Sequence, residues 1–557
     1  MRNRSTKTKN KNHENQIKDN VGLPWSTKEK LFISVTLRLF SVFLTRTFFV
    51  PDEYWQSTEV AHYNVFGYGY VTWEWKQKIR SYFYPFLFEI YFRTVKLFAI
   101  DSLFFVVYGP HVMQALLTSF CDLSVYYSAF NLFGSDKIAS LAFFNQICSW
   151  FLIYTGSRTL SNTAEMCFST FGIFYLFAST SKSNFFLSLL FGGISCIIRP
   201  TSVIIWFPLV LREIIYSKRS MKNIAVNLIF VTSTLLMLIL GVDFYFYKQF
   251  VLTHWNFLRF NLIEDMSQFY GSHPFYWYFF EGLPVVFGFS IAFIFLGALK
   301  CKKQRFFLWI ILLYVIAHSF ISHKEFRFVL PTIPIASFYA GYGLNFLSTL
   351  ISKKKFYMLL VVLVISNTFV ALYFCLIHQR GSIDVIKYLS AQSSKNIKVL
   401  FLMPCHSTPY YSYLHRNVSL QFLTCHPSSE LSYVEEAEAF YFEPISWLNE
   451  IAAFSKTHVV FYNVIPESVK TYFQDIGFKQ VGCPNQTPSY CSSTPHMFYL
   501  YVCGCNSTSY MFWLFFSPFV YTKKKKFRLH LFFTLIFQKE GLVAILLFMK
   551  LQIKCNK

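Results

Sequence analysis

Long apolar blocks alternate with short polar segments along most of this chain. A helix needs about 20 apolar residues to cross a hydrocarbon core of roughly 30 Å, so each block predicts a membrane-spanning helix, although 184–198 is short. The pattern indicates an α-helical polytopic membrane protein. The predicted spans are 31–50, 103–131, 137–156, 163–181, 184–198, 201–217, 224–247, 275–299, 305–322, 328–350 and 356–377.

Composition supports a membrane protein and argues against a nucleic-acid-binding protein. The chain is 54% hydrophobic with a mean hydropathy of +0.38, which is unusual for a soluble domain. Its formal charge of +23 would suit a nucleic-acid partner, but the basic residues form short clusters between apolar blocks. No RNA-binding motif or continuous basic face is present. A bias of Lys and Arg toward cytosolic loops explains the charge better, and we expect no nucleic-acid binding.

The basic clusters also predict the topology. Lys218 to Lys222, Lys300 to Arg305 and Lys353 to Lys355 share a side with the polar residues 1–30 if 51–102 is one loop on the far side. We therefore expect a basic cytosolic tail over 1–30, no cleaved signal peptide, and a transmembrane domain over 31–377. Within the loop, 82–98 is apolar but carries charges, which favours an interfacial helix. The alternative, in which 82–98 crosses the membrane, stays open.

With this topology, residues 378–505 lie opposite the cytosol. Short alternating apolar and polar runs in 395–505 predict a small α/β domain. Three glycosylation sequons agree with a luminal position: Asn417, Asn485 and Asn506. Six cysteines predict disulfides: Cys405, Cys425, Cys483, Cys491, Cys503 and Cys505. Zinc binding by Cys503 and Cys505 is a weaker alternative, because no second pair matches them.

Charged and polar residues gather in the short loops predicted to face the lumen. Asp52 and Glu53 directly follow the first block, where a carboxylate at membrane depth is costly and therefore suggests function. On position alone, the alternative that both acids sit in water and mark the end of a helix is equally open. Each of the others alone is more often an interfacial anchor, but their common side predicts a charged cavity at the membrane surface. They are Arg80, Arg158, Asn162, Glu165, Arg199, His273, His323, Lys324 and Arg327.

Such a cavity suits sugar transfer from a lipid phosphate. The phosphate leaves as an anion, so it needs cations and no general acid. The acceptor hydroxyl needs a carboxylate to take its proton while it attacks from the opposite face. A single displacement of this kind inverts the anomeric carbon. No metal-ligand spacing such as D-x-D is found on the luminal side, so we predict no metal site.

Two motifs carry a family resemblance. Phe49 to Ser57, with Thr72 to Trp75 and Ile79 to Tyr82, resembles the first luminal loop of the dolichyl-phosphate-mannose-dependent mannosyltransferases, glycosyltransferase family 22. Ser322 to Phe328 resembles the second signature of this family. Gly271 to Pro274 and Met403 to Ser412 are similar to the branch that adds the third mannose of the glycosylphosphatidylinositol (GPI) anchor. The resemblance covers about 30–505.

The resemblance implies a GT-C fold with about 11 transmembrane helices in the endoplasmic reticulum membrane, with its active site in the luminal loop 51–102. It implies α-1,2 transfer of mannose from dolichyl-phosphate-mannose to a GPI lipid that carries two mannoses, without a further cofactor. Asp52 becomes the expected base, with Glu53 as the competing candidate. Arg80, Arg199, Lys324 and Arg327 become candidates for the donor phosphate. Candidates for donor or acceptor binding also include Arg158, His273 and His323.

Two departures and two alternatives accompany this interpretation. Many relatives have His where this chain has Val50, so a required His there is excluded. Residues 506–557 do not match the family, and we expect either additional membrane segments or an error of gene prediction. The alternatives for function are a sister mannosyltransferase of dolichol-linked N-glycan assembly and a lipid or solute transporter. No related halves that would indicate a transporter are apparent.

Overall fold

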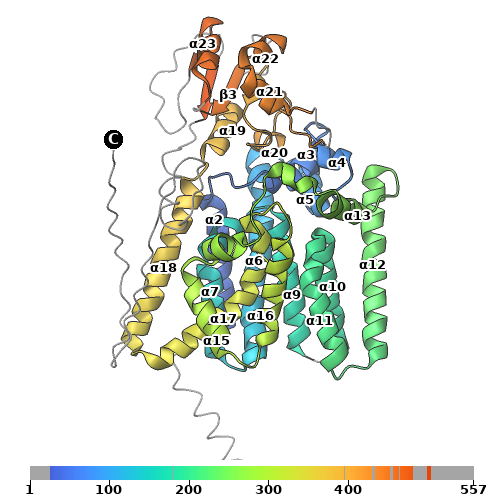
Figure 1. Ribbon diagram of the computed structural model, residues 1–557, viewed down its shortest axis with the longest axis vertical. Helices are drawn as coiled ribbons and strands as arrows, with labels where there is room; N and C mark the ends of the chain where they lie inside the picture. The colour runs from blue at the N-terminus through green and yellow to red at the C-terminus, as the bar shows by residue number, and fades with distance from the viewer. Residues whose placement is uncertain are drawn as a thin grey trace, which may run out of the picture. The chain divides into compact units, whose positions relative to one another are not determined.

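The computed structural model describes residues 25–179, 181–393, 396–428, 433–451, 456–462, 465–480 and 498–502. Within them, helices form an upright bundle, and a β-sheet lies at one end of it (Figure 1). The bundle helices are α2 (Thr27–Leu44), α6 (Leu103–Phe133), α7 (Asp136–Cys148), α8 (Trp150–Thr155), α9 (Ser161–Ala178), α10 (Lys182–Ile198), α11 (Val203–Tyr216), α12 (Met221–Tyr247), α14 (Leu283–Phe287), α15 (Ile291–Lys300), α16 (Arg305–Ser319), α17 (Thr332–Leu350) and α18 (Lys353–Leu376).

Each predicted span is helical over most of its length, but two are interrupted. The segment 137–156 breaks at Ser149, whose ψ of 117° ends α7 before α8 begins. The segment 275–299 includes a π-turn, and Gly288 adopts a φ of 51° between α14 and α15. Among the described residues, four helical stretches are long and apolar enough to cross a membrane: Leu103–Phe133, Met221–Tyr247, Tyr278–Lys300 and Lys353–Leu376. The chain is therefore a helical, multi-pass membrane protein.

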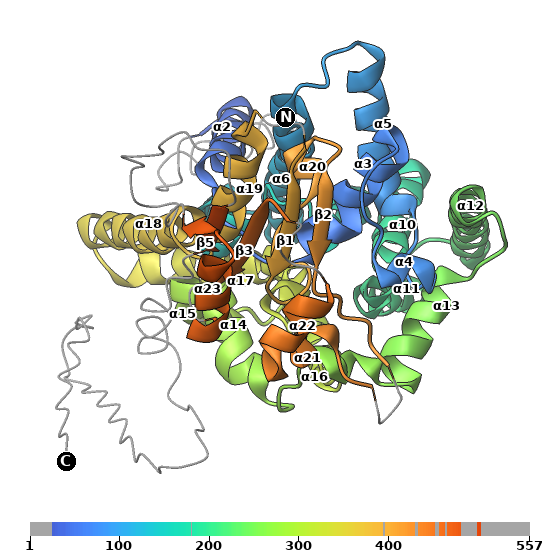
Figure 2. The same cartoon turned by 90° about the horizontal axis from the view of Figure 1, so that it is seen from above.

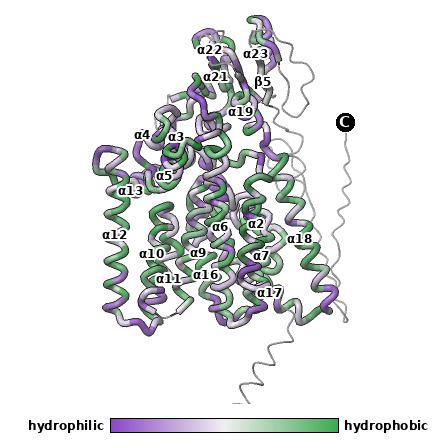
Figure 3. The backbone as a smooth tube through the Cα atoms, turned by 180° about the vertical axis from the view of Figure 1, so that it is seen from behind, coloured by the Kyte–Doolittle hydropathy of each residue, from purple (hydrophilic) through white to green (hydrophobic). Residues whose placement is uncertain are grey.

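The basic loops lie together at the end of the bundle away from the sheet. They connect α11 to α12, α15 to α16 and α17 to α18 (Figure 1). Hydrophilic positions concentrate at this end and around the sheet, whereas the helices between are mostly hydrophobic (Figure 3). The three basic loops therefore lie at one end of the bundle, as the basic clusters in the sequence predict.

The segment 51–102 folds over the sheet end of the bundle. It contains the π-helix η1 (Tyr54–Thr58), α3 (Glu59–Phe66), α4 (Trp73–Lys76) and α5 (Phe83–Leu97). In the view from above, α5 is seen along its length, whereas α12 is seen end-on (Figure 2). The predicted helix at 82–98 therefore lies across the end of the bundle, which is the arrangement expected of an interfacial helix.

The sheet is parallel, and its described strands run in the order β2-β1-β3-β5-β4. Residues of β1 alternate between its two faces, as the two-residue period of a strand requires. Leu400 and Leu402 pack toward α21–α23, whereas Val399 and Phe401 pack toward α19 and the first loop. The elements are β1 (Lys398–Leu402), β2 (Ser419–Phe422), β3 (His458–Tyr462), β4 (Lys479–Gln480), β5 (Phe498–Val502), α19 (Gly381–Ala391), α20 (Tyr411–Leu414), α21 (Glu436–Phe442), α22 (Pro444–Glu450) and α23 (Glu467–Asp475).

The sheet and the bundle share a core. Trp55 and Tyr54 of the first loop pack in one buried cluster with Phe401, Tyr410 and Val460. The predicted mixture of strands and helices in 395–505 is present. The sheet nevertheless belongs to the same compact unit as the helices.

Close packing of α15 on α17 generates the first prediction. A Cβ atom on Gly297 would lie 1.8 Å from the carbonyl oxygen of Tyr339, and one on Gly343 would lie 2.2 Å from that of Phe293. Because both neighbours are backbone atoms, the Gly297→Ala variant must move the helices apart, at an expected cost of about 1–3 kcal/mol. Thermal unfolding of the purified protein in detergent measures this loss.

Gly241 in α12 provides the matched control, since a Cβ there meets nothing within 4 Å. Gly241→Ala should keep or slightly raise the unfolding temperature, because alanine favours a helix. Equal unfolding temperatures for the two variants would contradict the predicted packing.

Candidate active site

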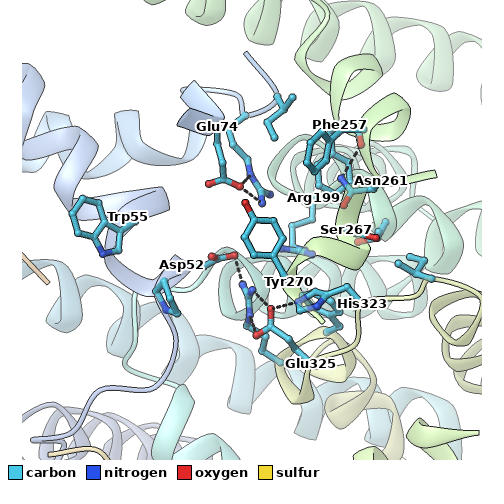
Figure 4. Close-up of a pocket in the computed structure, with 18 of the residues that line it drawn as sticks. Asp52, Trp55, Glu74, Arg199, Phe257, Asn261, Ser267, Tyr270, His323 and Glu325 are labelled. Carbon is cyan, nitrogen blue, oxygen red and sulfur yellow. Dashed lines mark hydrogen bonds and ion pairs between the residues drawn. The ribbon is translucent and has the colours of Figure 1, made fainter. Parts of the chain in front are cut away.

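A cavity of about 400 Å³ opens where the first loop, the bundle and the sheet meet (Figure 4). Its walls come from segments far apart in the sequence: the first loop, the break between α10 and α11, residues 257–270, residues 318–328 and the loop after β1. The polar and aromatic lining residues used below are Asp52, Trp55, Glu74, Arg80, Arg199, Asn261, Tyr270, His323, Glu325, Arg327 and His406.

Asp52 occupies the first helical turn after α2, which begins at Pro51. Its carboxylate oxygen Oδ2 lies 2.6 Å from Nη1 of Arg327, and 23% of its side chain stays exposed. Arg327 comes from η7 (Phe326–Val329), between α16 and α17. One ion pair thus joins the two family signatures that the sequence places 275 positions apart.

Arg327 also holds a second carboxylate. Its guanidinium donates from Nε to Glu325 Oε2 at 2.8 Å and from Nη2 to Glu325 Oε1. Burial disfavours ionised Glu325, but the charge of Arg327 outweighs it, so the pKa of Glu325 is lowered. Burial likewise opposes protonation of His323, yet its 3.1 Å hydrogen bond to Glu325 prevails and raises the pKa of His323. These groups form one charged network.

Arg80 forms a second ion pair on another wall. Its Nε and Nη2 donate to Glu74 Oε1 at 3.0 and 2.8 Å. The amide of Gln56 donates to the same carboxylate. The short helix α4 carries Glu74, and Arg80 follows it, so local sequence positions both groups (Figure 4).

Arg199 reaches the cavity from the break between α10 and α11. Pro200 begins the 3₁₀ turn η2 (Pro200–Ser202), which ends α10 at this point. The guanidinium Nε lies 3.3 Å from Oε2 of Glu165 on α9, and Nη1 donates to Ser161. Since the ion pair with buried Glu165 holds the guanidinium in place, Arg199 presents a charged group to the cavity in a fixed position.

Glu53 and Arg158 do not line this cavity, contrary to the prediction that the loop charges converge. Arg158 Nη1 lies 2.6 Å from Glu53 Oε2, and both side chains are buried. Burial raises the pKa of Glu53. Arg158 also donates to the carbonyl of Tyr154 and to Thr47. The reason for the separation is geometric, because adjacent residues on a helical turn point about 100° apart.

Lys324 and His273 are also absent from the cavity lining. The ammonium of Lys324 donates to the carbonyl oxygens of His273 and Ile321, at 2.8 and 2.6 Å. The ring of His273 stacks on Trp277 with centroids 4.8 Å apart. Both residues therefore brace the loop that carries His323 and Arg327.

Sequence reasoning missed several lining residues. Glu74 and Glu325 lie inside the two family motifs, so the motifs themselves could have marked them. His406 lies in the distinctive stretch Met403 to Ser412 but was not assigned a role. Tyr270, in η4 (Met266–Tyr270), carried no signal in its sequence context.

The predicted modifications are only partly visible. Asn417 is exposed between α20 and β2, whereas Asn485 and Asn506 lie outside the described residues. Cys405 and Cys425 form a disulfide. The other four cysteines lie outside the described residues: Cys483, Cys491, Cys503 and Cys505. Within the described part, Cys405, His406 and Cys425 cluster closely enough to suggest a metal site. The disulfide occupies both thiols, so this trio does not fit a metal ion.

The buried pair generates a stability prediction. Replacing Glu53 by Gln leaves the guanidinium of Arg158 buried without its acid, which should destabilise the protein by about 3–5 kcal/mol. The measurement is the thermal unfolding temperature and the yield of folded protein from membranes.

The control is Glu264→Gln, which removes the acid of the exposed pair Arg259–Glu264. Exposed pairs contribute about 0–1 kcal/mol, so this variant should unfold like the wild type. If Glu53→Gln also unfolds like the wild type, the pair does not support the fold.

Comparison with known proteins gives consistent matches. Residues 30–415 match the model of the Alg9-like mannosyltransferase family. The human protein named GPI alpha-1,2-mannosyltransferase 3 is 37% identical over 81% of this chain and 82% of its own length. The bovine protein of that name is 40% identical over 79% of this chain and 83% of its own length. The solved structure of ArnT from Cupriavidus metallidurans in the apo state has a TM-score of 0.49 and 11% identity, over 75% of this chain and 87% of that one. The family match covers more than half of the residues, and the chain belongs to the Alg9-like mannosyltransferase family.

Proposed function

We propose that this protein is the α-1,2-mannosyltransferase that adds the third mannose during GPI-anchor assembly. The donor is dolichyl-phosphate-mannose, and the acceptor is a GPI lipid that carries two mannoses. Relatives named for this activity match about four fifths of the chain. The observation that carries the chemical proposal is the cavity, in which Asp52, whose side chain is partly exposed, lies with Arg80, Arg199 and Arg327.

Asp52 is the proposed general base. It takes the proton of the acceptor hydroxyl as that oxygen attacks the anomeric carbon. Glu74 and Glu325 each hold an arginine through two hydrogen bonds, and Glu53 is buried away from the cavity. Of these four acids, Asp52 is therefore the one best placed to accept a proton from a substrate.

The arginines are the proposed binding groups for the donor phosphate. The mannose–phosphate bond breaks with both electrons moving to the phosphate oxygen, so dolichyl phosphate leaves as an anion without a proton. Guanidinium groups bind such an oxyanion through paired hydrogen bonds. In this scheme they neutralise the leaving group, and the reaction needs no metal ion or cofactor. Single displacement inverts the anomeric carbon.

The proposed setting is the endoplasmic reticulum membrane, in a GT-C architecture with about 11 spans. We place the N-terminus in the cytosol and the cavity in the lumen. Three features support this orientation. The basic loops share the end of the bundle away from the sheet, which fits cytosolic loops. The disulfide between Cys405 and Cys425 suits an oxidising compartment. Asn417 is exposed in a glycosylation sequon.

An in vitro assay tests the reaction. Purified protein is incubated with dolichyl-phosphate-mannose and a GPI lipid that carries two mannoses, with and without EDTA. We expect a product with a third mannose, α-1,2-linked, at equal rates in both conditions. Transfer only to a dolichol-linked N-glycan precursor would contradict the acceptor assignment, and loss of transfer in EDTA would contradict the metal-free scheme.

The Asp52→Asn variant tests the base. Removing a general base usually slows a reaction by about 10²–10⁴-fold, and we expect a fall of this size in kcat. The unfolding temperature should change little, because Arg327 keeps its two hydrogen bonds to Glu325. Wild-type kcat in this variant would remove Asp52 from the mechanism.

A further inference from the structure

A loop from the sheet forms one wall of the cavity. It follows β1 and spans Pro404 to Pro409, and Cys405 and His406 line the cavity beside Asp52 and Trp55. Arg199 and Arg327 of the bundle and Arg80 of the first loop line the same cavity. The sheet therefore contributes directly to the site and does not only cover it.

The loop is held firmly against the first loop. The indole Nε1 of Trp55 donates to the carbonyl oxygen of Thr408 at 3.1 Å. The buried carboxylate of Glu59 accepts from the backbone N–H of Tyr410 at 2.8 Å and from the hydroxyl of Ser412 at 2.6 Å. Because these bonds join segments about 350 positions apart, they fix the loop relative to Asp52.

His406 has the geometry of a ligand-binding residue. Its ring packs on Trp55 with centroids 4.7 Å apart and on Phe422 at 5.5 Å. Its Nδ1 lies 3.7 Å from Cys425 Sγ, which makes only a weak contact. Within the described part of the chain, Nε2 makes no hydrogen bond. The ring is only partly exposed, and that exposed part faces the cavity.

The protonation state of His406 suits a sugar hydroxyl. Burial lowers the pKa of His406 to about 4, so the ring is neutral at pH 7. A neutral imidazole offers one N–H donor and one acceptor nitrogen. A sugar hydroxyl can use either role, whereas a phosphate would favour a cation.

The position of His406 favours a contact with the acceptor sugar and not with the donor phosphate. In Figure 4, Asp52 lies between Trp55 on one side and Arg199 on the other. In a single displacement, the acceptor oxygen attacks the face opposite the leaving phosphate. If the arginines bind that phosphate, the acceptor approaches Asp52 from the side of Trp55, where His406 packs.

We infer that His406 is a specificity-determining residue for the acceptor, whose terminal sugar donates to or accepts a hydrogen bond from the imidazole beside Asp52. This inference rests on the proposed function. It assigns to the sheet a role in recognising the acceptor glycan, and none in binding the donor phosphate.

The test measures KM separately for the two lipids in the full-length purified enzyme. We expect His406→Ala to raise KM for the two-mannose GPI acceptor by about tenfold, the effect of one lost hydrogen bond, and to change KM for dolichyl-phosphate-mannose by less than twofold. His406→Gln, which keeps a donor and an acceptor, should retain most of the affinity. His406→Phe keeps the packing on Trp55 but should behave like His406→Ala.

His426→Ala is the matched control, because His426 adjoins the disulfide but is not among the cavity residues. Its two KM values should equal those of the wild type. A wild-type acceptor KM for His406→Phe, or a parallel rise in donor KM, would overturn the inference and leave a packing role. If His406→Ala unfolds, the Gln and Phe variants decide the question. Failure of the proposed function would give a different result: the wild-type protein itself would then transfer no mannose to the GPI acceptor.

Discussion

The buried ion pair between Glu53 and Arg158 determines where the neighbouring acid points. Arg158 lies between α8 and α9, and its guanidinium also binds the carbonyl of Tyr154, so the pair ties the first loop into the bundle. Thr159 adds a hydrogen bond to the carbonyl oxygen of Glu53 at 2.7 Å. A buried charge that loses its partner is costly, so this contact strongly favours one orientation of the turn. Asp52, one residue earlier, is thereby directed to the cavity.

The cavity is charged but nearly balanced. Arg327 is held by Asp52 and Glu325, Arg80 by Glu74, and Arg199 by Glu165. These carboxylates fix each guanidinium before a substrate arrives. Preorganised charges stabilise a transition state well, because they need not reorient as charge develops. The donor phosphate must therefore compete for arginines that already have carboxylate partners.

Much of the fold follows from sequence pattern, because a membrane imposes simple rules on length and charge. Apolar blocks and basic clusters predicted the helices and the common end of the basic loops. The breaks at Ser149 and Gly288 were not visible, since each depends on the local backbone and not on hydropathy. The family motifs placed Asp52 and Arg327 in one site, and the structure joins them.

The sequence alone does not distinguish the residues that line the cavity from those that support its walls. Glu53 and Lys324 are adjacent to residues of the cavity, yet their side chains point elsewhere, because neighbouring positions on a turn face different directions. His406 lies more than 350 positions from Asp52, and only the folded chain shows that both line one cavity. Contacts between distant segments have no signature in local periodicity.

Separate measurement of binding and transfer in Asp52→Asn, side by side with the wild type, tests the central claim most directly. We expect the variant to bind the two-mannose GPI lipid with wild-type affinity and dolichyl-phosphate-mannose at least as tightly as the wild type, because Arg327 loses one competing carboxylate. A single turnover should be slowed by at least about 10²-fold. Transfer at the wild-type rate, or a loss of donor binding that accounts for the whole defect, would contradict the assignment of Asp52 as the base.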